Sequence, residues 1–388
     1  MQTFAERQQI ERRFGLAPRQ GLERAASEGP LSYRPELDGV RAIAILLVLG
    51  FHAGCPLLPG GFIGVDVFFA LSGFLITSIL TAEIGSTGTL DYRRFLIRRF
   101  LRLLPAFWLM VGLYVAATSL SANRWTHFGD AAIALTYTAN FVRAAGVGRP
   151  GLLGHTWSLA VEEQFYLCWP LLLLLLTRFT RSPGRRAVAV AGLACASFLH
   201  RTICVCFADA SFERIYNAPD THADGLLLGC AAGILAQSVR WRAPASICRG
   251  WPPVALVGLL ALALIGETES NVMSTAGLFA GALLTASLLV CLVQPHEAPI
   301  KRALAHPQLV YLGKISYGVY LWHFPIMKLL QTSGRDWEFV LIVGSCLSVT
   351  AAAVSYRFVE RPFLELKKHF EFRPPVETAP PQPIRRSA

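Results

Sequence analysis

Long hydrophobic stretches recur along almost the whole of this 388-residue chain. An α-helix needs about 20 apolar residues to cross the hydrocarbon core of a bilayer, and these stretches approach that length. A helix satisfies its own backbone hydrogen bonds inside lipid, so the pattern predicts an all-α, polytopic bundle of about ten transmembrane helices. The predicted spans cover residues 37–55, 62–84, 103–120, 156–177, 187–206, 222–239, 252–266, 273–293, 309–330 and 338–358.

One apolar segment does not fit this series of spans. Residues 130–144 are short for a crossing and include Asn140 and Arg143. If they crossed, the basic residues at 178–186 would lie outside the cell, away from the other basic clusters. We therefore predict a re-entrant or interfacial segment, in which irregular backbone packs on protein or lines a cavity.

The apolar pattern defines a single membrane domain at residues 37–366. Residues 1–36 are predicted to be a cytoplasmic N-terminal segment, because they mix acidic and basic residues without the apolar region of a cleavable signal peptide. Residues 367–388 are proline-rich, and we expect a disordered cytoplasmic tail. No internal repeat is evident, which weakens an interpretation as a transporter with inverted halves.

Composition and charge agree with a membrane protein, since 53% of the residues are hydrophobic and only 16% are charged. The net charge of +11 would suggest nucleic-acid binding in a soluble protein, but basic residues of a membrane protein mark cytoplasmic loops. We therefore predict the lipid bilayer as a partner, no nucleic acid, and both termini in the cytoplasm. The basic clusters that fall on one side are Arg93, Arg94, Arg98, Arg99, Arg102, Arg178, Arg181, Arg185, Arg186, Arg240, Arg242, Arg249, Lys301 and Arg302.

The nine cysteines lie mostly within the apolar stretches and show no zinc-like pairing. Cys204 and Cys206 lack a second pair of ligands. We interpret the cysteines as small core residues and predict no metal site.

Two ionisable residues lie in the first predicted span, Arg41 and His52. Their spacing on a helix leaves them about 20° apart around its axis and about 16 Å apart along it. With this placement, Arg41 near the cytoplasmic end of the helix can hold an anionic carrier, while His52, deeper in the membrane, can exchange protons. A structural alternative is that Arg41 extends to lipid phosphates while His52 is an interfacial histidine.

The second and third spans carry further candidates. Asp66 follows a glycine-rich stretch, where it can orient a histidine on a neighbouring helix while the glycines permit close helix packing. Arg99 and Arg102 share one helical face and suit phosphate binding, although arginines at this position also simply anchor a cytoplasmic loop.

The fourth span opens with the unusually polar sequence HTWSLAVEEQFYL. Such groups are hard to explain by packing, because each needs a polar partner in a low-dielectric setting. We therefore predict a polar site, with these candidates: His155, Trp157, Ser158, Glu162 and Tyr166.

Two weaker clusters follow in later spans. Asp224 belongs to the first, DTHAD, and Tyr320 and His323 belong to the second, SYGVYLWH. The aromatic residues of the second cluster are equally typical of an aromatic belt at the membrane surface.

In these motifs the chain resembles the acyltransferase-3 family of bacterial integral membrane acyltransferases. The resemblance runs from about Leu37 to Leu366. It comprises, in the family's order, the blocks LDGVRAIAILLVLGFH, GGFIGVDVFFALSGFLIT, RRFLRLLP, HTWSLAVEEQFYLCWP and ISYGVYLWHFPI. One departure is His222, which stands where many relatives carry the arginine of Asp-Thr-Arg-Ala-Asp.

The resemblance implies transfer of an acyl group, commonly acetyl, from cytoplasmic acyl-CoA to a hydroxyl of a sugar or glycolipid. The acceptor would lie at the outer face of the bacterial cytoplasmic (inner) membrane. Acyl-CoA would be a co-substrate, and no permanently bound cofactor is expected. Only residues 367–388 follow the region of resemblance, which ends at about Leu366, so we expect the stand-alone form without a fused hydrolase-like domain.

The resemblance also assigns roles to residues. Arg99 and Arg102 correspond to the family's Arg-x-x-Arg element and, with Arg41, would bind acyl-CoA. The family's histidine falls on His52, which would act as a general base or form a transient acyl-imidazole.

Two carboxylates would assist this histidine. Either Asp66 or Glu162 would fix the tautomer of His52, and Glu162 belongs to the family's Glu-x-x-Phe-Tyr element. The remaining candidates would line the site or contact the acceptor: His155, Trp157, Ser158, Tyr166, Asp224, Tyr320 and His323.

Two other functional classes remain as alternatives to an acyltransferase. A transporter of a small molecule or lipid-linked sugar would neither bind CoA nor hydrolyse acetyl-CoA. A purely structural membrane subunit would be unaffected by replacement of His52.

Overall fold

The computed structural model describes residues 33–148, 151–238, 243–268 and 270–370. Within these ranges the chain is entirely helical and contains no β-strand. The predictions for the first 32 residues, for Arg240 and Arg242, and for the proline-rich tail from residue 371 lie outside the described residues.

Every predicted span coincides with a helix of the structure. These helices are α3 (Pro35–Ala53), α4 (Ile63–Thr87), α5 (Tyr92–Thr118), α8 (Thr156–Phe179), α9 (Pro183–Phe207), α12 (Asp224–Ala236), α13 (Ala245–Ile265), α14 (Leu278–Val293), α16 (Pro307–Thr332) and α18 (Ser345–Ser355). The shorter elements are α6 (Arg124–Leu135), α7 (Ala139–Ala144), η1 (Gly151–Leu153), α10 (Phe212–Asn217), α11 (Pro219–His222), η2 (Met273–Gly277), α15 (Pro299–Leu304), α17 (Trp337–Phe339), η3 (Val340–Gly344), η4 (Tyr356–Glu360), α19 (Arg361–Lys367) and η5 (Lys368–Phe370).

Seven helical stretches in the described ranges are long and apolar enough to cross a membrane. Three predicted spans are not among the seven, namely those of α3, α12 and α16. Helix α3 carries three charged residues, Glu36, Asp38 and Arg41, and α16 contains many polar residues. Helix α12, at 13 residues, rises only about 20 Å. A multi-pass helical bundle is therefore established, while the total of about ten crossings stays a prediction.

The third predicted span begins earlier than expected. The predicted span begins at residue 103, after the arginines, but α5 already begins at Tyr92. The side chain of Asp91 caps this helix by accepting a hydrogen bond from the backbone N–H of Arg94 at 2.9 Å. The arginine-rich sequence is thus the first part of a helix, and its side chains are held at fixed positions on that helix.

The segment at residues 130–144 does not form one helix. It is divided between α6 and α7, and the break contains Tyr137 with a positive φ of 52°. Neither helix is long enough to cross a bilayer. Asn140 on α7 is fully buried and pairs with Gln164 of α8, so the segment packs on protein.

Helix α4 lies at the centre of the bundle and packs against α3, α8, α12 and α14. The close helix approach predicted from the glycines is confirmed at Gly73, where a Cβ would collide with the backbone carbonyl of Leu226 on α12. Gly229 of α12 faces the backbone of Ala70 in the same way. The two helices therefore meet through small residues, as in other membrane proteins.

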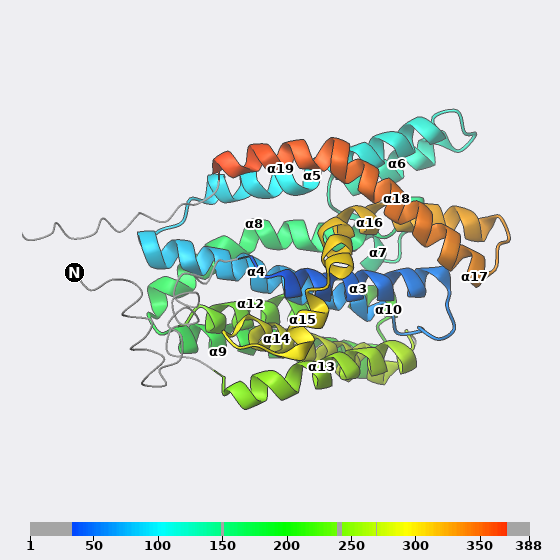
Figure 1. Cartoon of the computed structure of the whole chain (residues 1–388). Coiled ribbons are helices and arrows are strands. Elements are labelled where there is room, and N and C mark those ends of the chain that lie inside the picture. The colour runs from blue at the N-terminus through cyan, green and yellow to red at the C-terminus, as the bar shows by residue number, and fades with distance from the viewer. Residues whose placement is uncertain (1–32, 149–150, 239–242, 269, 371–388) are drawn as a thin grey trace, which may run out of the picture.

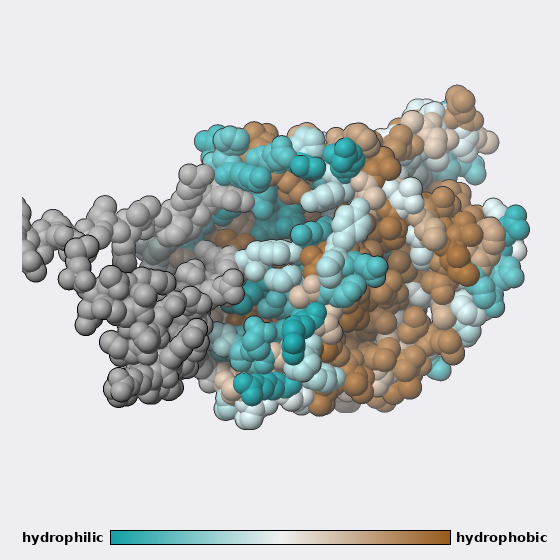
Figure 2. Space-filling view, in the orientation of Figure 1, coloured by the Kyte–Doolittle hydropathy of each residue, from teal (hydrophilic) through white to brown (hydrophobic). Residues whose placement is uncertain are grey.

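The turn between α4 and α5 and the turn between α8 and α9 lie at the same end of the bundle (Figure 1). Figure 2 shows an apolar band over the middle of the helices, with hydrophilic residues toward both ends. Exposed large side chains such as Leu199 on α9 and Val257 on α13 contribute apolar surface that water would disfavour. This surface is the one expected of a protein embedded in lipid.

Candidate functional site

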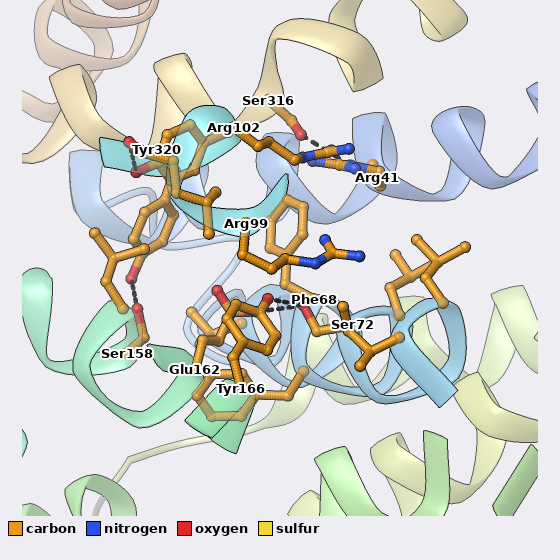
Figure 3. Close-up of a pocket in the computed structure, with 18 of the residues that line it drawn as sticks. Arg41, Phe68, Ser72, Arg99, Arg102, Ser158, Glu162, Tyr166, Ser316 and Tyr320 are labelled. Atoms are coloured by element: carbon orange, nitrogen blue, oxygen red, sulfur yellow. Dashed lines mark hydrogen bonds between the residues drawn. The ribbon is translucent and has the colours of Figure 1, made fainter. Parts of the chain in front are cut away.

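A cavity of about 210 Å³ lies between α3, α4, α5, α8, α16 and α19 (Figure 3). We call it the donor cavity. Its polar lining consists of Arg41, Ser72, Arg99, Arg102, Ser158, Glu162, Tyr166, Ser316, Tyr317, Tyr320 and Lys367. Its apolar lining comes mainly from α4, including Phe68, Leu75 and Ile79. The structure thus brings seven of the predicted site residues together in one cavity.

Three arginines from two helices face the donor cavity (Figure 3). The Nε of Arg41 donates a hydrogen bond to the hydroxyl of Ser316 at 3.2 Å. The guanidinium carbon of Arg99 lies 5.6 Å from the centre of the Tyr166 ring, a cation–π contact. The helical start of α5 places Arg99 and Arg102 on one face, as the sequence spacing predicted. These groups can bind a polyanion.

Glu162 lies among these arginines and does not contact His52. Its Oε1 accepts a hydrogen bond from Ser72, whose hydroxyl lies 3.1 Å from that of Tyr166. Arg41, Arg99 and Arg102 interact with it electrostatically. The expectation that Glu162 fixes the tautomer of His52 is therefore wrong, because this carboxyl group is hydrogen-bonded to Ser72 and lines the donor cavity together with the arginines.

Two hydroxyl groups in the lining of the donor cavity, those of Ser158 and Tyr320, point toward each other (Figure 3). The oxygens of Ser158 and Tyr320 lie 2.6 Å apart. The Tyr320 hydroxyl also lies 3.2 Å from the backbone oxygen of His155, to which it donates a hydrogen bond. Tyr320 thus lines the donor cavity and also contacts two histidines, since its ring centre lies 5.7 Å from that of His155 and 5.2 Å from that of His323.

The histidine group contains His52, His155 and His323. The Nδ1 of His323 lies 2.7 Å from the backbone oxygen of Tyr320, which can only accept, so this nitrogen carries a proton. The Nε2 of neutral His323 is then an acceptor, and it lies 3.2 Å from Nδ1 of His52. That Nδ1 also points to the backbone oxygen of Val48 at 3.1 Å.

These contacts determine the tautomer of His52. Because its Nδ1 faces two acceptors, Nδ1 carries the proton and Nε2 keeps a free electron pair. His52 is partly exposed, in contrast to the fully buried His323. The structure therefore gives His52 a basic nitrogen oriented by His323, a partner that the sequence interpretation had not assigned.

His155 is 2% exposed, and neither of its ring nitrogens has a hydrogen-bond partner in the described residues. Its ring stacks on Phe324 with centres 5.1 Å apart, and His52 packs edge-on against the same phenylalanine at 5.2 Å. Within the described ranges, no three histidine, cysteine, aspartate or glutamate side chains are arranged to hold a metal ion.

Asp66 also lies away from His52, and its expected role in fixing that tautomer is wrong. Its Oδ1 lies 2.7 Å from Nε2 of His222, and both side chains are almost completely buried. The Nδ1 of His222 donates to the backbone oxygen of Tyr216 at 2.6 Å. His222, which departs from the family pattern, thus still pairs with an aspartate.

Asp224 does not line the donor cavity. Both of its oxygens accept hydrogen bonds from Arg201 of α9, at 2.8 and 2.7 Å, in a fully buried ion pair. Trp157 is directed to the same region and stacks on His222 at 6.1 Å. Both residues contribute to the packing between α8, α9 and α12 and do not line the donor cavity.

The sequence interpretation did not select several residues that the structure makes important. Ser72, Ser316 and Lys367 line the donor cavity, but serines and a lysine near a helix end carry no distinctive signal. Arg201 does carry one, because an arginine inside the apolar stretch 187–206 requires a buried partner.

Comparisons with known proteins agree on one relationship. A family model described as an acyltransferase domain matches residues 34–357. The chain is 34% identical over 352 residues to YrhL of Bacillus subtilis, covering 85% of this chain and 55% of that protein. It is 33% identical over 350 residues to the peptidoglycan O-acetyltransferase OatA of Listeria monocytogenes, covering 85% and 56%. The chain thus spans little more than half the length of these relatives. No solved structure matches it.

Proposed function

Because the chain belongs to the acyltransferase-3 family of membrane acyltransferase domains, we propose that it is an O-acyltransferase. It moves an acyl group, by preference acetyl, from cytoplasmic acyl-CoA to a hydroxyl of a sugar or glycolipid. The acceptor lies at the outer face of the bacterial cytoplasmic membrane. The Listeria relative is named for acetylation of peptidoglycan, which supports a glycan acceptor here.

The observation that carries this proposal is the donor cavity with its arginines at one end and the histidine group beyond the other. The phosphates of acyl-CoA bind Arg41, Arg99 and Arg102, since guanidinium groups form charge-assisted hydrogen bonds with phosphate. The pantetheine arm follows the apolar wall of α4 toward Ser158 and Tyr320. These hydroxyls must separate to let the thioester reach His52.

His52 then has two possible roles in transfer. As a general base, its Nε2 takes the proton of the acceptor hydroxyl while the oxygen attacks the thioester carbonyl and the carbon–sulfur bond breaks. As a nucleophile, the same nitrogen attacks the thioester and forms an acyl-imidazole that the acceptor hydroxyl later opens. In both routes the proton finally reaches the CoA thiolate, which leaves as the thiol.

Replacement of His52 by alanine tests this proposal. We expect loss of acyl transfer with nearly unchanged acetyl-CoA binding, because the donor cavity does not include His52. Loss of a general base costs about 10²–10⁴ in rate, whereas loss of an obligatory nucleophile stops turnover. His306→Ala is a matched control, since His306 is exposed at the start of α16.

Acylated protein formed from acetyl-CoA alone, and absent in the His52→Ala variant, would support the covalent route. Normal product formation by His52→Ala would refute both routes. Wild-type protein that neither binds CoA nor hydrolyses acetyl-CoA would favour transport instead.

The same proposal requires a defined topology. Reporter fusions at Arg98, Arg181, Lys301 and the C-terminus are expected to report a cytoplasmic location, because clusters of basic residues resist translocation. The shared end of the α4–α5 and α8–α9 turns supports this arrangement (Figure 1). An external Arg181 would contradict it and would require the segment at residues 130–144 to cross the membrane.

A further inference from the structure

A second cavity of about 220 Å³ lies beside the donor cavity, between α3, α5, α16 and the helical stretch that includes η4 and α19. Its lining consists of Tyr33, Asp38, Arg41, Arg102, Lys314, Tyr317, Tyr356, Glu360 and Leu364. Arg41, Arg102 and Tyr317 line both cavities. The two cavities are therefore neighbours that share a wall of two cations and one aromatic ring.

The chemistry of the second cavity differs from that of the first. Leu364 is its only aliphatic lining residue in the described part of the chain, so an acyl chain would find little apolar surface. Three cations, Arg41, Arg102 and Lys314, face two carboxylates, Asp38 and Glu360. A site built only for an inorganic anion would not include two carboxylates, because they repel phosphate.

Several side chains at this cavity are held in place. The Nζ of Lys314 lies 5.1 Å from the centre of the Tyr33 ring. The hydroxyl of Tyr33 donates to Oδ2 of Asp38 at 2.7 Å, and Glu360 pairs with Ser355 at 3.4 Å. A ligand with phosphate groups, an aromatic ring and hydrogen-bond donors matches this combination of cations, tyrosines and carboxylates.

We propose that the second cavity binds the nucleotide half of acyl-CoA, adenosine 3′-phosphate. This inference rests on the proposed function and divides the donor between two sites. The diphosphate lies at the shared wall, against Arg41 and Arg102. The pantetheine arm enters the donor cavity, and the nucleotide turns into the second cavity.

Each group of the nucleotide has a partner of suitable chemistry. Lys314 binds the 3′-phosphate by a charge-assisted hydrogen bond. The ring of Tyr356 stacks on adenine, since every base offers a flat π-face to an aromatic side chain. Asp38 and Glu360 accept hydrogen bonds from the ribose hydroxyl and the adenine amino group, the only strong donors of the nucleotide.

Binding measurements on the purified full chain test this assignment with three ligands: acetyl-CoA, its 3′-dephospho form and S-acetylpantetheine. Lys314→Ala is expected to weaken acetyl-CoA binding about 10- to 100-fold and to change binding of the dephospho form less than about twofold. Tyr356→Ala is expected to weaken the binding of both nucleotide-containing ligands at least about fivefold and to leave the binding of S-acetylpantetheine unchanged.

Arg302→Ala is the matched control, because it removes one exposed positive charge from α15 outside both cavities. Thermal unfolding checks that each variant is folded. The nucleotide site is refuted if Lys314→Ala weakens the binding of acetyl-CoA and of its dephospho form equally. It is also refuted if Lys314→Ala weakens acetyl-CoA binding no more than Arg302→Ala does. In both cases the proposed function stands. If the wild type binds none of the three ligands, the proposed function fails and this inference fails with it.

Discussion

The hydrogen bond between His323 and His52 allows a quantitative prediction about the tautomer. His323→Leu removes the Nε2 acceptor that lies 3.2 Å from Nδ1 of His52. The backbone oxygen of Val48 remains at 3.1 Å from the same nitrogen, so the N–H keeps one of its two acceptors. The favoured tautomer is therefore weakened but not lost.

The size of the effect follows from this geometry. A neutral hydrogen bond contributes about 0.5–1.5 kcal/mol, which corresponds to about a 2- to 12-fold change in rate. We expect kcat for acyl transfer to fall within that range in His323→Leu, with little change in acetyl-CoA affinity. His323→Gln is the informative partner variant, because its Oε1 can replace the lost acceptor and restore much of the rate.

The assay is release of the CoA thiol from acetyl-CoA by protein in membranes that contain the acceptor, measured over a range of acetyl-CoA concentrations. A fall of more than about 10³ in folded His323→Leu would refute the reasoning, because that loss is typical of a general base or nucleophile. Equal rates for His323→Leu and His323→Gln, both well below wild type, would also contradict the acceptor role.

Three further predictions concern the donor cavity and the buried charges. Alanine at Arg99 or Arg102 should weaken acetyl-CoA binding about 10- to 100-fold, measured by titration calorimetry, and unchanged affinity would mean that these arginines only anchor the helix. Arg201→Met leaves Asp224 buried without its partner and should lower the free energy of unfolding by about 3–5 kcal/mol. The double variant Arg201→Met/Asp224→Leu should recover most of the lost stability. A double variant as unstable as the single one would mean that the loss comes from packing. Burial raises the pKa of the Asp130 carboxyl, although its hydrogen bond with Tyr114 opposes the shift, so the folded state binds more protons than the unfolded state. Its contribution to stability should therefore fall as the pH rises from about 3.9 through the folded pKa, and Asp130→Asn should remove this part of the pH dependence of thermal unfolding.

The sequence alone determined where the helices lie, because length and apolar character are local properties that lipid selects for directly. Helix α14, together with the short π-helix η2 before it, occupies the predicted residues 273–293. The predicted third span begins too late, at residue 103, because the run of arginines before it is not apolar. Arginine is nevertheless a good helix former, and Asp91 supplies the cap that starts the helix.

Spacing along one helix also predicted which residues share a face, but it did not reveal what that face meets. Arg99 and Arg102 line one cavity as expected from their spacing of three residues. Asp66, by contrast, pairs with His222 on another helix rather than with His52.

Only the tertiary structure decided these partners. A buried polar group must find its partner on a neighbouring helix, and the neighbour depends on how all the helices pack around α4. The contact between His52 and His323 joins residues 271 positions apart, a pairing that no local pattern encodes. The polar residues were therefore visible in the sequence as costly exceptions to an apolar pattern, while their chemical roles depended on packing between helices.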